Sequence, residues 1–197
     1  MNFKLFSTNI YVSYYFCALI CLVLLTDRSG VALPCFIGIL VHEISHLALM
    51  IYFGNRPREI LVSPGGFTIV GKGAVPHKSQ VTISLVGPFV NILGGLLFLL
   101  YYFVFKDIAS LLWFGVWMVL GVINLFPSAF LDGGTAIYSY FCYKSSEKSA
   151  KTVLRITTFL SAVLFIIFTV YFFVNYGFNL TFLLFCIYLC MACFFKI

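Results

Sequence analysis

Charged side chains are scarce in this chain. Only 9% of its 197 residues are Asp, Glu, Lys or Arg, whereas 62% are hydrophobic. A water-soluble domain carries about 25% charged residues, so this composition excludes an ordinary soluble protein and predicts an integral membrane protein. The net charge of +6 then reflects how the chain is oriented in the lipid bilayer, and we expect no nucleic-acid partner.

We also expect neither a disulfide framework nor a cleaved leader. The seven cysteines are an odd number, and all but Cys142 lie in apolar runs, where they act as small apolar residues. The first apolar run ends at Leu25, and no A-x-A cleavage site follows it. We therefore expect this run to be a retained membrane span.

Apolar runs long enough to cross a bilayer recur along the chain. A spanning helix needs about 20 mostly apolar residues. The runs that qualify cover approximately residues 7–25, 31–53, 81–105, 108–130, 153–174 and 178–195. The predicted fold class is an all-α membrane protein with about six transmembrane helices. We expect one domain over residues 1–197, without a PDZ or nucleotide-sensing domain.

The basic residues lie mostly on one side of this predicted bundle. Of the 12 Lys and Arg residues, all but Arg28 and Lys106 fall at the termini, in the segments after the second and fourth runs, or, in the case of Arg155, at the start of the fifth run. Short cytoplasmic loops carry an excess of Lys and Arg. Both termini are therefore predicted to be cytoplasmic.

The segment 58–71 is too short to span the bilayer and has a different pattern. It predicts two short strands, about 59–62 and 67–70, around a turn at Ser63-Pro64-Gly65-Gly66. Pro followed by Gly suits the centre of a type II turn, where Gly supplies the positive φ angle. A short β-hairpin between the second and third helices is the prediction, and a plain connecting loop is the alternative.

A metal-binding pattern, His42-Glu43-Ile44-Ser45-His46, lies in the middle of the second apolar run. Residues four apart share one face of a helix, so both imidazoles can reach the same ion. Ionisable side chains are costly at membrane depth and usually mark function there. The pattern predicts a zinc site inside the membrane.

The acidic residues suggest the third zinc ligand. Of the six Asp and Glu residues, only Glu43 and Asp132 lie within or at the edge of an apolar run. Asp132 belongs to the segment 124–134, in which Pro127 and two glycines can break the fourth helix. Such an irregularity is tolerated at membrane depth only inside protein or beside water. The competing ligand, His77, lies in a basic loop next to Lys78.

These residues have the chemistry of a hydrolase. Catalytic zinc takes three protein ligands and keeps a position for water, and His42, His46 and Asp132 would provide one such site per chain. Glu43 would accept a proton from the activated water and pass it to the leaving amine. The Asn124 amide either holds the substrate carbonyl or satisfies backbone groups freed by Pro127.

Together the motifs resemble the site-2 protease family of intramembrane zinc metalloproteases. Its marks are H-E-x-x-H in one membrane helix and N-x-x-P-x-x-x-x-D-G in a later one, which stand here at residues 42–46 and 124–133. The stretches 64–66 and 87–91 also match softer features of the family. The resemblance covers residues from about 35 to 135.

The resemblance implies a role for each matching residue. Carried over, the zinc ligands are His42, His46 and Asp132, the general base is Glu43, and Asn124 together with Pro64, Gly65 and Gly66 contacts the substrate. The hairpin would add an unwound substrate segment as an extra strand. A peptide bond inside a helix is shielded, so the substrate must be extended before water can attack.

The layout of six spans looks most like the bacterial sporulation branch of the family, which processes a sigma-factor precursor. The resemblance thus implies a multi-pass protein of the bacterial cytoplasmic membrane that cleaves a membrane protein or a membrane-associated substrate. A sigma-factor precursor or an anti-sigma factor is the expected substrate class. A membrane regulator is a further expected partner.

Three other classes of protein are compatible with parts of the pattern. A non-enzymatic zinc carrier or scaffold would need more ligands along a path through several spans. Paired histidines also bind haem, but haem requires neither Glu43 nor Asp132. A prenyl-protein type of metalloprotease uses a glutamate as third ligand, and Glu59 and Glu147 are poorly placed for that.

Overall fold

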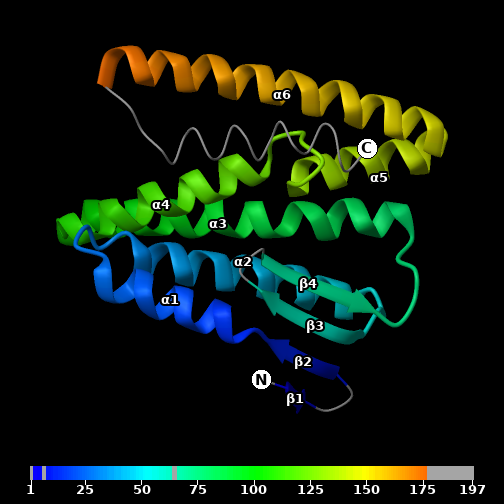
Figure 1. The fold of residues 1–197 in the computed structure, drawn as a ribbon, viewed down its shortest axis with the longest axis horizontal. Coiled ribbons are helices and arrows are strands. Elements are labelled where there is room, and N and C mark those ends of the chain that lie inside the picture. The colour runs from blue at the N-terminus through cyan, green and yellow to red at the C-terminus, as the bar shows by residue number, and fades with distance from the viewer. Residues whose placement is uncertain (1, 6–7, 64–65, 177–197) are drawn as a thin grey trace. The chain divides into compact units, whose positions relative to one another are not determined.

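A computed structural model describes residues 2–5, 8–63 and 66–176 (Figure 1). The elements in chain order are β1 (Asn2–Leu5), β2 (Thr8–Val12), α1 (Tyr14–Thr26), α2 (Ala32–Tyr52), β3 (Pro57–Ser63), β4 (Gly66–Gly71), α3 (His77–Phe105), α4 (Ile108–Asn124), α5 (Asp132–Lys144) and α6 (Glu147–Tyr176). They form two compact units. The first unit comprises Met1–Pro76 and Val86–Val122, and the second comprises His77–Leu85 and Ile123–Ile197.

The first unit contains a four-stranded sheet in the order β1-β2-β3-β4. The strands β3 and β4 are antiparallel, with Ile60 opposite Ile69, and they occupy the place of the predicted hairpin. The strand β2 runs parallel to β3, with Ile10 opposite Ile60. Parallel strands need a crossover connection, and here α1 and α2 supply it. Both strands of this pair therefore lie at the same end of the helical hairpin (Figure 1).

The predicted first span, residues 7–25, is wrong in its first part. Residues Thr8–Val12 form β2, and α1 begins only at Tyr14. The cause is pairing with β3, which a run of β-branched and aromatic residues favours and which hydropathy alone does not distinguish from a helix. At 1.5 Å per residue, the 13-residue α1 is about 20 Å long, shorter than a bilayer core of about 30 Å.

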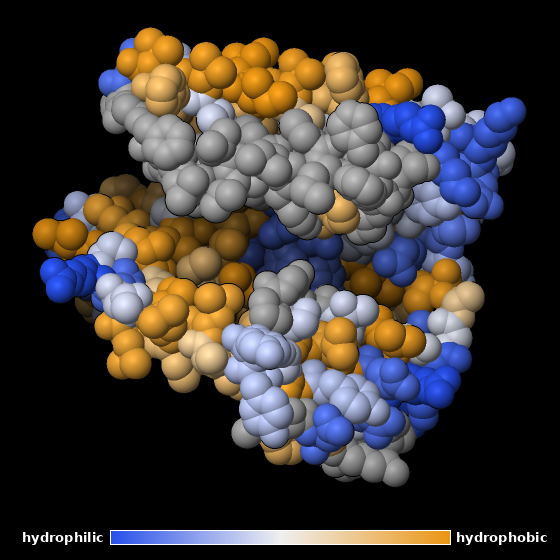
Figure 2. All heavy atoms as spheres, in the orientation of Figure 1, coloured by the Kyte–Doolittle hydropathy of each residue, from blue (hydrophilic) through white to orange (hydrophobic). Residues whose placement is uncertain are grey.

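Three helices of the described chain are long and apolar enough to cross a membrane: Ala32–Tyr52, His77–Phe105 and Glu147–Asn175. The helices α1 and α4 are apolar but shorter. Apolar side chains are exposed along α6, as Figure 2 shows and as a helix facing lipid requires. The chain therefore has the character of a membrane protein, while the number of six spans stays a prediction. The predicted span 178–195 lies outside the described residues.

Trp117 of α4 joins three helices of the first unit. Its indole Nε1–H donates a hydrogen bond to the Pro34 carbonyl of α2 at 3.0 Å. A Cβ atom at Gly38 of α2 would lie 3.1 Å from the same nitrogen, and one at Gly94 of α3 would overlap the indole ring. Small residues thus let the three backbones approach closely, which is the usual basis of helix association in membranes.

The second unit contains the predicted interruption of the fourth helix. Helix α4 ends at Asn124, ahead of Pro127, and α5 begins at Asp132. The residue before a proline is disfavoured in the α conformation, so the helix stops upstream. The predicted span 108–130 is therefore too long, and the separate helix α5 was not predicted, because its mixed polar and apolar sequence lacks the length of a span.

The interrupted segment is held tightly against its surroundings in the second unit. A Cβ atom at Gly133 would overlap the Leu125 carbonyl, and one at Gly134 would overlap the Ser128 carbonyl. The hydroxyl of Thr158, a fully buried residue of α6, accepts a hydrogen bond from the Ala129 N–H at 3.0 Å. These contacts fix the backbone that leads into Asp132.

We expect Thr158→Val to lower stability by about 1–3 kcal/mol, because the buried Ala129 N–H loses its acceptor. Unfolding of the detergent-solubilised protein in a denaturant titration measures the loss. Thr157→Val is the matched control, since the Thr157 hydroxyl donates only to the Leu154 carbonyl of its own helix at 3.1 Å. Equal stability of the two variants would contradict the role of Thr158.

Candidate metal centre

Two histidines of α2 turn their ring nitrogens toward each other. The Nε2 atoms of His42 and His46 are 3.0 Å apart, and the rings meet at 79°. His42 is buried, with 6% of its surface exposed. When two nitrogens bind the same tetrahedral zinc ion, each at about 2.0–2.1 Å, they lie roughly 3.3 Å from each other. Small ring rotations would therefore bring this pair to the spacing that one metal ion requires.

Helix α3 passes close to the two imidazoles at Gly87. A Cβ atom there would overlap His46 Nε2 and would lie 2.7 Å from His42 Cε1. Gly87 and the following Pro88 are both buried. The absence of a side chain at this one position leaves room for both rings between α2 and α3.

Asn91, one turn after Gly87 on α3, contacts the other nitrogen of His42. Its Nδ2 atom lies 3.2 Å from His42 Nδ1. The residue is 1% exposed, and its Oδ1 atom has no hydrogen-bond partner among the described residues. In the sequence Asn91 belongs only to the stretch 87–91 that resembles a softer feature of the family, whereas the structure places it against a candidate ligand.

Glu43 lines a different surface of α2. An apolar cavity of about 600 Å³ lies between α1 and α2, with Phe16 and Leu19 on one wall and Cys35, Ile39 and Glu43 on the other. The last three are spaced by four residues and therefore share one face of the helix. The candidate base Glu43 thus follows His42 in sequence and lines this apolar cavity, which we call the apolar groove.

The loop between α1 and α2 closes one end of this groove. The Asp27 carboxylate accepts hydrogen bonds from the Ser29 hydroxyl at 2.6 Å and from the Ala32 N–H at 2.8 Å. These bonds, the Ser29 hydroxyl first, hold the pKa of Asp27 below its ordinary value. The negative charge is favourable beside the free N–H groups at the start of α2, so it helps to define where that helix begins.

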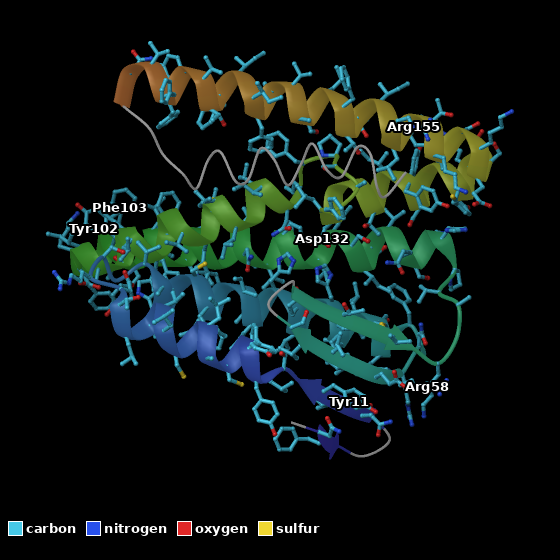
Figure 3. The ribbon with its side chains drawn as sticks, viewed as in Figure 1. Tyr11, Arg58, Tyr102, Phe103, Asp132 and Arg155 are labelled. Carbon is cyan, nitrogen blue, oxygen red and sulfur yellow. The ribbon has the colours of Figure 1, made fainter. Side chains whose placement is uncertain are left out.

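The remaining predicted site residues belong to the second unit or to the sheet. Asp132 is the first residue of α5 (Figure 3), Asn124 is the last residue of α4, and both are half-buried. His77 is not in a loop, as predicted, but is the exposed first residue of α3. Gly66 begins β4, opposite Ser63. The predicted contacts Pro64 and Gly65 lie outside the described residues.

Sequence reasoning missed the contribution of α3 to the histidine pair. Gly87 and Asn91 are four residues apart, so they lie on one helix face, and an asparagine within an apolar run is itself a signal of function. The groove residues Cys35 and Ile39 show the same spacing with respect to Glu43. Periodicity applied along α2 from Glu43 would have found the groove residues, but no periodicity within α2 could show that α3 contacts the histidines.

No model of a known protein family matches this chain, and no curated protein matches its sequence. Among solved structures, a site-2 protease from Methanocaldococcus jannaschii has a similar fold, with a TM-score of 0.66. The match covers 100% of this chain and 94% of that one, at 19% identity. This likeness shows a site-2 protease type of fold. It does not extend to the narrower resemblance with the sporulation branch.

We expect Gly87→Ala to displace both imidazoles and to lower the amount of metal that the purified protein retains. Elemental analysis of the protein after dialysis measures this loss. Gly115→Ala in α4 is the matched control, because a Cβ atom at Gly115 meets nothing within 4 Å and the helix propensity changes in the same way. Metal retention equal to that of the control would contradict the close approach at Gly87.

Proposed function

We propose that this chain is an intramembrane zinc metalloendopeptidase, which hydrolyses a peptide bond in or near a transmembrane segment of its substrate. The observation that carries the proposal is the pair of facing imidazoles on α2, a helix long and apolar enough to span a membrane. Glu43 follows the first of these histidines directly and borders an apolar groove. The similar fold of a site-2 protease supports the same reading.

The proposed zinc ligands are His42, His46 and Asp132, with one ion per chain. Two imidazole nitrogens and a carboxylate oxygen are a donor set that could hold a metal and that suits zinc. The room left by Gly87 supports the fit for the two histidines. When bound, zinc supplies a Lewis acid that polarises water and the substrate carbonyl.

Glu43 acts as the proposed general base and acid. Its carboxylate removes a proton from the attacking water while the water oxygen bonds to the scissile carbonyl carbon. The same carboxyl group then gives that proton to the amide nitrogen, and the C–N bond breaks to leave a carboxylate and an amine. The Asn124 amide orients the substrate carbonyl in this proposal.

The proposed substrate segment binds in an extended conformation along the sheet. Within the described part of the chain, β4 is an outer strand of the sheet and has β3 as its one neighbour. An outer strand presents free backbone N–H and C=O groups to which another strand can be added. Pro64, Gly65 and Gly66 belong to this proposed binding region. Apolar side chains beside the scissile bond suit the apolar groove that Glu43 borders.

We propose a bacterial cytoplasmic membrane protein with cytoplasmic termini, a sigma-factor precursor or an anti-sigma factor as substrate, and a membrane regulator. The sheet supports one element of this topology. It joins β1, the strand that contains Lys4, to the same sheet as β3, which contains Arg58 (labelled in Figure 3), so in this proposal both strands lie on the cytoplasmic side.

Glu43→Gln is expected to abolish cleavage, because the amide cannot take up the proton of water, while zinc content and folding are retained. The assay co-expresses the protein with candidate substrates, each a tagged single-span protein, and follows the fragments by immunoblot. Glu59→Gln makes the same chemical change on β3, where Glu59 pairs with Arg58 at 3.5 Å, and should cleave normally. Cleavage by Glu43→Gln at the wild-type rate would show that the mechanism is wrong.

Asp132→Ala is expected to lose zinc, because two imidazoles alone hold the ion weakly. Zinc content of the purified protein is the measurement, with Asp107→Ala as a control in the exposed segment before α4. Unchanged zinc in Asp132→Ala would exclude this aspartate as a ligand. Metal-dependent transport in proteoliposomes without peptidase activity would favour a zinc carrier instead of a protease.

A further inference from the structure

The contact between Asn91 and His42 determines which ring nitrogen of His42 carries the proton. A neutral imidazole carries one N–H, on either Nδ1 or Nε2. If the Asn91 amide nitrogen donates to Nδ1, the proton of His42 must be on Nε2. That atom is the one that points at His46 Nε2, 3.0 Å away, and a protonated Nε2 has no lone pair for a metal.

If the Oδ1 and Nδ2 atoms of Asn91 exchange places, the proton of His42 can lie on Nδ1 and Nε2 keeps its lone pair. The oxygen and nitrogen of an amide have nearly the same shape, so their assignment follows from the hydrogen bonds that each can make. Oδ1 has no partner among the described residues, although Asn91 is 1% exposed. A buried carbonyl oxygen without a donor costs about 1–3 kcal/mol. Turning the amide gives this oxygen a donor, the Nδ1–H of His42.

We propose that Asn91 is a positioning residue for the metal site. Its Oδ1 atom accepts a hydrogen bond from His42 Nδ1–H, which holds the imidazole in the tautomer whose Nε2 lone pair is free to bind a metal. The inference rests on the proposed function, since it takes His42 as a zinc ligand. Nothing in the paired-histidine motif itself specifies this residue.

The position of Asn91 on α3 fits this role. Gly87 lies four residues earlier on the same helix face, beneath the two imidazoles. Because Gly87 has no side chain, α3 can lie close enough to α2 for the short Asn91 side chain to reach His42 Nδ1, at 3.2 Å. The burial of the pair keeps water from replacing the amide as the partner of Nδ1.

Zinc affinity of purified protein in detergent, measured by competition with a chelating dye, tests the proposal. Asn91→Leu and Asn91→Ala remove the acceptor, the first at similar volume and the second without added bulk. Partners of a metal-bound histidine typically contribute 10–100-fold to affinity, so both variants should bind zinc about 10–100-fold more weakly than the wild type.

The Asn91→Asp variant tests whether residue 91 acts as a hydrogen-bond acceptor or as a donor. A carboxylate can accept from Nδ1–H but cannot donate to Nδ1, so this variant should recover about tenfold or more of the affinity that Asn91→Ala loses. Ser110→Ala is the control in the same unit. It removes a buried hydroxyl that donates to the Asp107 carbonyl, away from the histidines, and should leave zinc affinity unchanged.

The outcomes separate this inference from the proposed function. Wild-type affinity in both Asn91→Leu and Asn91→Ala would overturn the positioning role alone. An Asn91→Asp variant that binds as weakly as Asn91→Ala would show that the residue is not needed as an acceptor, and would also overturn it. A wild-type protein that binds no zinc would overturn the proposed function and this inference together.

Discussion

The close approach of α3 to α2 at Gly87 is the contact on which the candidate site depends. A side chain at that position would occupy the space of two imidazole rings. With glycine there, His42 is buried beside its neighbour, and Asn91 reaches the far nitrogen of its ring. In the proposed site, the packing of α3 against α2 would therefore decide which nitrogen atoms of the histidines are available to a metal.

Polar groups buried in an apolar helical protein must find partners in the protein, since lipid offers none. The structure meets this requirement with single side chains that bridge elements. Trp117 donates to the Pro34 carbonyl between α4 and α2, and Thr158 accepts from the Ala129 N–H beside the interrupted helix. Each hydrogen bond connects segments far apart in the sequence. It therefore stabilises backbone that is irregular or closely packed, whereas the backbone of a regular helix satisfies its own hydrogen bonds.

The paired histidines stand out in the sequence as a candidate metal site, whereas the irregular backbone could not be predicted from it. Residues 42–46 stand out because charge is rare and periodicity is strong within one helix. The strand β2 was mistaken for part of a span, because its partner β3 is about 50 residues away and hydropathy does not report pairing. The role of Asn91 depends on a packing distance between helices, which no local pattern encodes.

The two faces of α2 are arranged so that, in the proposed function, one helix would serve both metal and substrate. Pro34, Gly38 and His42 recur every fourth residue and are buried against neighbouring helices, whereas Cys35, Ile39 and Glu43 recur with the same spacing one position later and line the groove. A shift of one residue is a rotation of about 100° around the helix axis. A base adjacent in sequence to a metal ligand therefore stands at the edge between the two faces. That edge is where a polypeptide lying in the groove could meet an activated water molecule without displacing the histidines.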